Sequence, residues 1–223
     1  GKVNSDLTVG TDLTRASRLA ANQKLAFMGM KLHGQGFVVS EGEAQLLGLG
    51  KVEGLELYLR PYLNGRDLTA RSRAKYVLDF FGLEHAQIRA RYPQAYQHLI
   101  ETVRAEREIV RDRSPTTDAI EYAGRWWLFG KPRPELRPAI AGLSRYIAST
   151  RTAKHRLFSF LESNIVPESE IIVFGSDDGL LLAFLSSYIH RLWALRIGGT
   201  LEDRPRYNNS LIFDPFPFPD PSD

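Results

Sequence analysis

Three charged residues near the end of the sequence, Glu202, Arg204 and Arg206, occupy every second position. If this segment is extended, their side chains point to one face, because side chains alternate along a strand. A carboxylate beside a guanidinium matches the two halves of one base pair in the major groove of DNA. Glutamate accepts a hydrogen bond from the amino group of cytosine, and arginine donates two to the edge of guanine. The alternative is an ordinary solvated turn that carries a weak surface ion pair.

A strongly basic stretch precedes these residues. Between positions 125 and 156 the only acid is Glu135, and the basic residues are Arg125, Lys131, Arg133, Arg137, Arg145, Arg151, Lys154 and Arg156. The stretch therefore carries +7, whereas the whole chain carries +3. Such a block is typical of a surface that binds phosphate, and its aromatic residues (Trp126, Trp127 and Tyr146) favour a rigid surface. The alternative is a solvated face of an ordinary protein.

The elements that must position these residues are predicted to be short strands and a few helices. Hydrophobic alternation predicts strands within 25–39 and at 55–59, 76–80, 126–129, 145–148, 155–161 and 170–174. A capping box at Ser40–Glu43 predicts a helix that ends near residue 48, and Pro134 predicts a brief one through residue 141. Residues 61–67 are predicted to form a turn in which Asn64-Gly65 supplies positive φ.

Two longer helices complete the prediction. An apolar stripe from residue 96 to 110 predicts a long central helix within 84–112, and a second stripe over 180–193 predicts a helix that begins at Asp177 or Asp178. Residues 214–223 are expected to form an extended tail, because each proline removes a backbone donor and disfavours helix before it. No repeat or low-complexity linker divides the chain, so we expect one α+β domain over residues 1–223.

Composition excludes several classes of protein. Hydrophobic residues make up 43% of the chain and aromatic residues 11%, which is typical of a globular core. The absence of cysteine excludes disulfides and thiolate zinc sites and fits a reducing compartment, so we expect the protein in the cytoplasm. No apolar run approaches the roughly 20 residues of a membrane helix, so we expect no membrane partner.

Signals for catalysis are weak. Gly34-Gln35-Gly36 lacks the third glycine of a nucleotide-binding loop, and the five histidines have no metal-ligand spacing. Asp177 and Asp178 would be half of a nuclease metal site, but no Glu-x-Lys follows them. We therefore expect neither a catalytic residue nor a cofactor or metal in this chain. The alternatives are a small metal-dependent nuclease and a protein-interaction module that docks through the aromatic tail.

A series of segments resembles one known family in the correct order. They are Arg60-Pro61-Tyr62-Leu63-Asn64-Gly65-Arg66-Asp67-Leu68, Arg125-Trp126-Trp127, Ser144-Arg145-Tyr146-Ile147-Ala148, Ala153-Lys154-His155-Arg156, and Gly199 to Tyr207 running into Phe216-Pro217-Phe218-Pro219. Together they resemble the target-recognition domain of MmeI-like enzymes, which combine a restriction endonuclease and an adenine-N6 DNA methyltransferase in one polypeptide. The resemblance covers essentially the whole chain.

The resemblance implies a role for each marked residue. In that family a Glu-x-Arg pair in the terminal segment reads one base pair, and an arginine two residues later assists at a neighbouring one. Glu202, Arg204 and Arg206 match these positions, whereas Pro205 stands where many relatives carry an aromatic residue. The implied partners are double-stranded DNA and the methyltransferase and nuclease domains of the same polypeptide, which use S-adenosylmethionine and Mg²⁺.

The two lines of reasoning lead to one expectation for the site. Glu202, Arg204 and Arg206 are expected to read bases. The residues expected to contact the DNA backbone are Arg145, Arg151, Lys154, His155 and Arg156. Backbone contacts would supply affinity and register, and base contacts would supply specificity.

Overall fold

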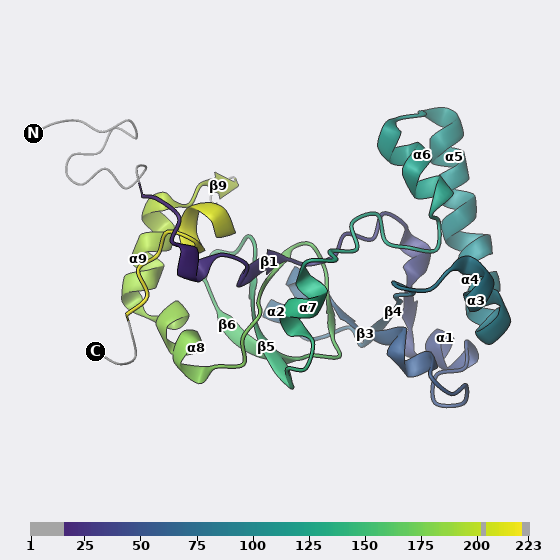
Figure 1. Ribbon diagram of the computed structural model, residues 1–223, viewed down its shortest axis with the longest axis horizontal. Helices are drawn as coiled ribbons and strands as arrows, with labels where there is room; N and C mark the ends of the chain where they lie inside the picture. Colours follow the sequence, from purple (N-terminus) through teal and green to yellow (C-terminus); the bar gives the residue numbers. More distant parts are fainter. Residues whose placement is uncertain (1–15, 202–203, 220–223) are drawn as a thin grey trace, which may run out of the picture. The chain divides into compact units, whose positions relative to one another are not determined.

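The computed structural model describes residues 16–201 and 204–219 and confirms the predicted α+β class. Contacts within the chain divide it into two compact units (Figure 1). Unit 1 is made of Gly1–Met28, Glu135–Ser163 and Glu170–Asp223, and unit 2 of Gly29–Pro134 and Asn164–Ser169. Each unit contains one four-stranded sheet.

The sheet of unit 1 is antiparallel, with strand order β1-β8-β5-β6. Its strands are β1 (Ala26–Met28), β8 (Ile171–Phe174), β5 (Arg145–Thr150) and β6 (Phe158–Glu162). β5 and β8 are central in this sheet and almost wholly buried. The predicted strands at 145–148, 155–161 and 170–174 are thus confirmed, although β6 starts at Phe158.

Helices α8 (Gly179–Ser186) and α9 (Tyr188–Ile197) stand where one continuous helix was predicted. Asp178 caps α8, as expected, but the chain is extended at Ser187 and its hydroxyl caps α9 by accepting from the backbone N–H of His190 at 3.2 Å. The helix axes consequently differ by 58°. Tyr188 and Ile189, counted in the predicted apolar stripe, are 66% and 71% exposed, and His190 is fully buried instead.

The proline-rich tail packs into unit 1. Residues 214–219 are non-helical, as predicted, and follow a π-helical turn, η6 (Asn209–Phe213). The Phe216 ring lies 4.5 Å from the imidazole of His190, and Phe218 lies 5.2 Å from Phe213, measured between ring centroids. The side chain of Asn22 holds the tail by donating to the carbonyls of Phe213, Asp214 and Phe216. These aromatic residues are therefore part of the core that supports the site.

Unit 2 has a sheet of order β2-β4-β3-β7, in which only the β3–β7 pair is parallel. Its strands are β2 (Val38–Ser40), β4 (Lys75–Leu78), β3 (Leu59–Leu63) and β7 (Val166–Pro167). The predicted capping box opens α1 (Glu41–Leu46), with the side chains of Ser40 and Glu43 each accepting from the backbone of the other. The strand predicted at 76–80 is β4.

Two predictions around β3 were wrong. Residues 55–57 form a 3₁₀ turn (η4, Leu55–Leu57) after Gly54 in the left-handed region, and the strand begins only at Leu59. The predicted turn at 61–67 is instead the end of β3 followed by helix α2 (Gly65–Thr69). Asn64 has φ −104° and caps this helix in a capping box with Asp67, so Asn-Gly supplies no positive φ here.

The predicted central helix of unit 2 is confirmed as a series of helical segments (Figure 1). They are α3 (His85–Arg91), α4 (Pro93–Leu99), the π-helical η5 (Ile100–Arg104) and α5 (Ala105–Arg113), with α6 (Thr117–Gly124) following. In unit 1, the brief helix expected after Pro134 is α7 (Leu136–Ile140).

The strand predicted at 126–129 was wrong because these residues form a turn. The buried guanidinium of Arg107 donates to the carbonyls of Tyr122, Arg125 and Leu128 at 2.9–3.1 Å and so holds the chain in this turn as it leaves α6. It also donates to the carbonyls of residues 32 and 33 at 3.0 and 2.9 Å. Five satisfied carbonyls compensate for burying this charge.

Candidate DNA interface

The terminal segment forms a small antiparallel hairpin directly after α9 (Figure 1). Its strands are β9 (Thr200–Leu201) and β10 (Arg204–Pro205), with Arg204 opposite Leu201. The segment is therefore extended at Arg204, as the period-2 argument requires, and Arg204 and Arg206 are both exposed. Glu202 lies outside the described residues, so its expected place on the same face stays a prediction.

The base of the hairpin is attached to the segment that follows β5. The backbone N–H of Tyr207 donates to the carbonyl of Arg151 at 2.7 Å, and that of Ala153 donates to the carbonyl of Pro205 at 3.3 Å. Thr152 and Arg206 form an isolated antiparallel bridge between these bonds. The expected base-reading segment and the expected phosphate-contacting segment are thus neighbours in space, although about 50 residues separate them in the sequence.

A pocket of about 300 Å³ lies beside this junction. It is lined by Ala153, Lys154, His155, Arg156, Leu157, Arg191, Ala194, Leu195, Pro205, Arg206, Tyr207 and Ile212. The lining contains no carboxylate, and its exposed cationic or histidine side chains are Lys154, His155, Arg191 and Arg206. This charge is suited to an anionic ligand with phosphate groups.

The side chains predicted to contact the DNA backbone differ in how far they are exposed and in whether they already have a partner within the protein. Lys154 and His155 are exposed, and no carboxylate in the described part of the chain pairs with them. Arg145 is exposed but its guanidinium lies over the ring of Phe160, 3.7 Å from the centroid. Arg151 is half-buried and forms a 3.4 Å ion pair with Glu170.

Arg156 differs from its neighbours because its donors are engaged within the protein. Its guanidinium donates to the carbonyls of Thr150, Arg151 and Pro205 and lies 5.2 Å from the centroid of the Tyr207 ring. Burial lowers the pKa of Arg156 to about 10, so the group stays charged at neutral pH. The predicted contact between Arg156 and DNA is untested, but the structure gives this side chain a task within the site.

The basic block is divided between the two units. Arg125, Lys131 and Arg133 belong to unit 2, and the remaining basic residues belong to unit 1. The aromatic residues expected to stiffen its surface (Trp126, Trp127 and Tyr146) are all buried. Trp127 packs into unit 2 and donates through Nε1 to the carbonyl of Leu83 at 2.9 Å. Charge along the sequence did indicate the segment around Lys154, but the aromatic residues serve the core.

Sequence reasoning missed two components of the site. Arg191 lines the pocket from α9, which no motif indicated. Tyr207 and His190 lie beneath the hairpin, with Oη of the tyrosine 2.9 Å from Nε2 of the histidine. Burial, and then the charge of Arg156, lowers the pKa of His190 to about 4, so its ring is neutral at pH 7. The spacing from residue 190 to 207 carries no signal by which sequence alone could pair them.

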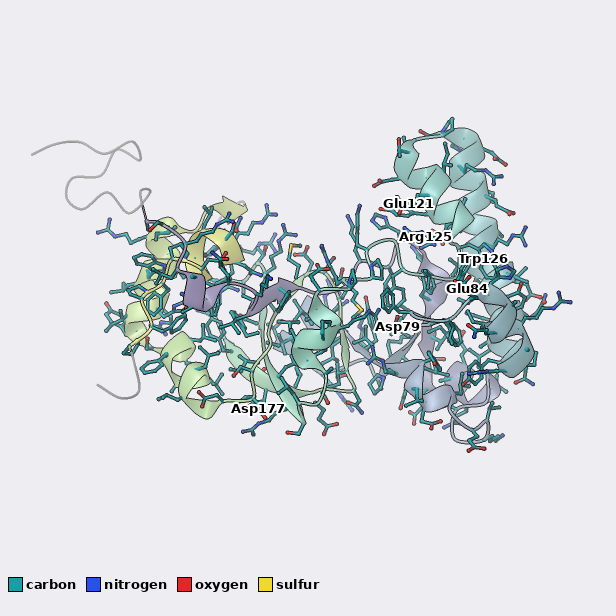
Figure 2. The ribbon with its side chains drawn as sticks, viewed as in Figure 1. Asp79, Glu84, Glu121, Arg125, Trp126 and Asp177 are labelled. Atoms are coloured by element: carbon teal, nitrogen blue, oxygen red, sulfur yellow. The ribbon has the colours of Figure 1, made fainter. Side chains whose placement is uncertain are left out.

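The alternatives gain little from the structure. Asp177 is exposed in the loop before α8 (Figure 2), and Asp178 uses its carboxylate to cap that helix by accepting from the N–H of Leu180 at 2.8 Å. Within residues 16–201 and 204–219, no three His, Asp or Glu side chains form a group that would hold a metal ion. The aromatic tail, which an interaction module would present, is packed against α9.

Comparison with known proteins identifies the family. The family model of the MmeI target recognition domain matches residues 12–220. This chain therefore belongs to the MmeI target recognition domain family. The target-recognition function expected from the sequence is confirmed at the level of this family. No curated protein matches the chain.

A solved structure has the same fold as this MmeI-type target recognition domain. It is the type IIL restriction-modification enzyme MmeI in complex with DNA, with a TM-score of 0.75 and 22% sequence identity. The match covers 98% of this chain and 28% of the length of that chain. At this identity the likeness shows the fold.

The described helices were also compared with the length of a membrane span. No single one among them is long and apolar enough to cross a membrane. Only the bent pair of α8 and α9 reaches that length and composition, and only when the two are taken together.

Proposed function

We propose that this domain binds double-stranded DNA and reads its sequence from the major groove with Glu202, Arg204 and Arg206. The observation that carries the proposal is the junction at which the hairpin bearing Arg204 and Arg206 meets the exposed side chains of Lys154 and His155. Family membership and the fold shared with a DNA-bound MmeI support it. Lys154, His155, Arg145 and Arg151 hold phosphates, and the hairpin approaches the base edges.

The rest of the intact polypeptide supplies the chemistry in this proposal. The domain positions DNA for adenine-N6 methylation, and for cleavage, by methyltransferase and nuclease domains outside this chain. In this proposal, S-adenosylmethionine and Mg²⁺ belong to those domains. The enzyme would act in the cytoplasm, where its DNA is. A target recognition domain of this kind holds the duplex while an adenine is extruded.

Glu202 and Arg204 are proposed to read one C·G pair. The carboxylate accepts from the cytosine amino group, and the guanidinium donates to O6 and N7 of guanine. The reverse arrangement leaves each charge facing a group of the wrong type. A good contact of this kind contributes about 1–3 kcal/mol of discrimination.

The test exchanges the two charges. Glu202→Lys combined with Arg204→Asp in the intact enzyme should change the preferred base at one position from C to G and leave the other positions alone. Sequencing of methylated sites measures the motif directly. A matched control exchanges an exposed pair in unit 2, Arg104→Asp with Glu108→Lys, whose charges are 2.8 Å apart. An active hairpin variant with an unaltered motif would refute base reading by this pair.

A further inference from the structure

The hairpin that carries the proposed base-reading residues has a weak point at Pro205. Proline has no backbone N–H, so it cannot donate to the opposite strand. The carbonyl of Pro205 is therefore its only backbone group for hydrogen bonding, and β10 is only two residues long. Contacts from outside the hairpin must hold Pro205 in place if the side chains of Arg204 and Arg206, on either side of it, are to point in defined directions.

Two donors from the segment after β5 meet this carbonyl. The backbone N–H of Ala153 donates to it at 3.3 Å, and Nη2 of Arg156 donates to it at 3.1 Å. The same guanidinium donates through Nη1 to the carbonyl of Thr150, at the end of β5. Arg156 thus joins the sheet of unit 1 to the last residue of β10 through one rigid, planar group.

The guanidinium is itself held from below. It lies over the ring of Tyr207, which is fully buried and whose hydroxyl group meets Nε2 of His190 at 2.9 Å. Phe216 from the tail packs edge-on against the same imidazole. A partly buried charged group is stable only where its donors are satisfied, and removal of one partner is costly. The arrangement is thus built to keep Arg156 in one place.

We propose that Arg156 is a positioning residue, which holds the carbonyl of Pro205 against the end of β5 and so sets the directions of Arg204 and Arg206. This inference rests on the proposed function. It differs from the expectation for Arg156 drawn from charge along the sequence, in which the guanidinium contacts a phosphate. Lys154, two residues away and exposed, is the phosphate contact of this segment.

The two roles differ in their dependence on salt. Each phosphate neutralised by a cation adds about 0.9 to the slope of log affinity against log salt concentration. A phosphate contact therefore changes affinity for all duplexes and lowers this slope. Substitution of a positioning residue changes only the difference in affinity between the preferred duplex and one with a substituted base pair.

The experiment compares Arg156→Lys and Lys154→Ala in the intact polypeptide, with binding to both duplexes measured from low to high salt. Lysine keeps the charge of Arg156 but cannot bridge the two carbonyls with a planar fork. Arg156→Lys should lower discrimination about tenfold, the loss of roughly one good base contact, with the salt slope unchanged. Lys154→Ala should weaken binding to both duplexes equally and lower the salt slope by about one.

A slope lowered by about one in Arg156→Lys, with equal loss on both duplexes, would overturn the inference and make Arg156 a phosphate contact. Unchanged discrimination would overturn it as well. Tyr207→Phe removes a single hydroxyl and provides a second, milder test. Discrimination between the two duplexes should fall while the salt slope stays constant. Discrimination equal to that of the wild type would contradict the role of Tyr207 in holding Arg156. If the wild type itself neither discriminates nor responds to salt, it is the proposed function that fails.

Discussion

His190 offers a quantitative test of how the core beneath the hairpin is built. Its ring is fully buried among the aromatic residues of unit 1 and is neutral in the folded state, since burial and the charge of Arg156 lower its pKa from 6.5 to about 4. In the unfolded chain the ring takes up a proton below about pH 6.5. In the folded state the ring takes up a proton only near pH 4, so a fall in pH from 6.5 to 4 favours unfolding.

The size of the effect follows from these two pKa values. The contribution of His190 to the free energy of unfolding is fully present above pH 7, and about 2 kcal/mol of it is lost by pH 5. About 3 kcal/mol is lost at pH 4. Because other groups titrate in the same range, the informative quantity is the difference in stability between the wild type and His190→Gln.

Urea denaturation at pH 7.5, 6, 5 and 4.5 measures this difference. The variant should be less stable at pH 7.5, and the gap should narrow by about 2 kcal/mol at pH 5 because glutamine does not titrate. His155→Gln makes the same substitution at an exposed position and controls for the loss of a histidine. A gap that stays constant from pH 7.5 to 4.5 would show that His190 titrates in the folded protein as freely as in the unfolded chain.

Two further predictions concern unit 2. Arg107→Met removes a donor from five carbonyls, of which only those of Leu32 and Arg125 keep a backbone donor. It should cost at least about 3 kcal/mol, seen as a large fall in the midpoint of thermal unfolding; a midpoint within a few degrees of wild type would contradict the role assigned to Arg107. Gly29→Ala places a Cβ 2.1 Å from the carbonyl oxygen of Glu168 and should destabilise strongly, whereas Gly42→Ala, which meets nothing within 4 Å in α1, should stabilise by about 0.5–1 kcal/mol. Equal effects of the two glycine variants in urea denaturation would refute the packing argument.

Local signals in the sequence were enough for several elements. The capping box at Ser40–Glu43 needs only four residues, and it forms as predicted. The hydrophobic pattern predicted strands at β5 and β8, and the prolines after Asp214 predicted a non-helical tail. Ordered motifs along the chain identified the family. At Asn64 the local signal was present but misread, because Asn-Gly suits a hairpin turn while Asp67 three residues later completes a capping box.

Contacts between distant residues decided the rest. The stretch 126–129 reads as a strand, but it forms a turn, in which a guanidinium about 20 residues away donates to the carbonyl of Leu128 and to those of Tyr122 and Arg125 just before the stretch. Lys154 and Arg156 look alike in a basic run, yet one is exposed and the other reaches the carbonyl of Pro205, 49 residues along the chain. Residue type and spacing therefore determined which side chains carry charge, whereas the tertiary structure decided which charges face solvent. The physical reason is that a buried donor must find its acceptor wherever the fold places one, and sequence distance does not limit that choice.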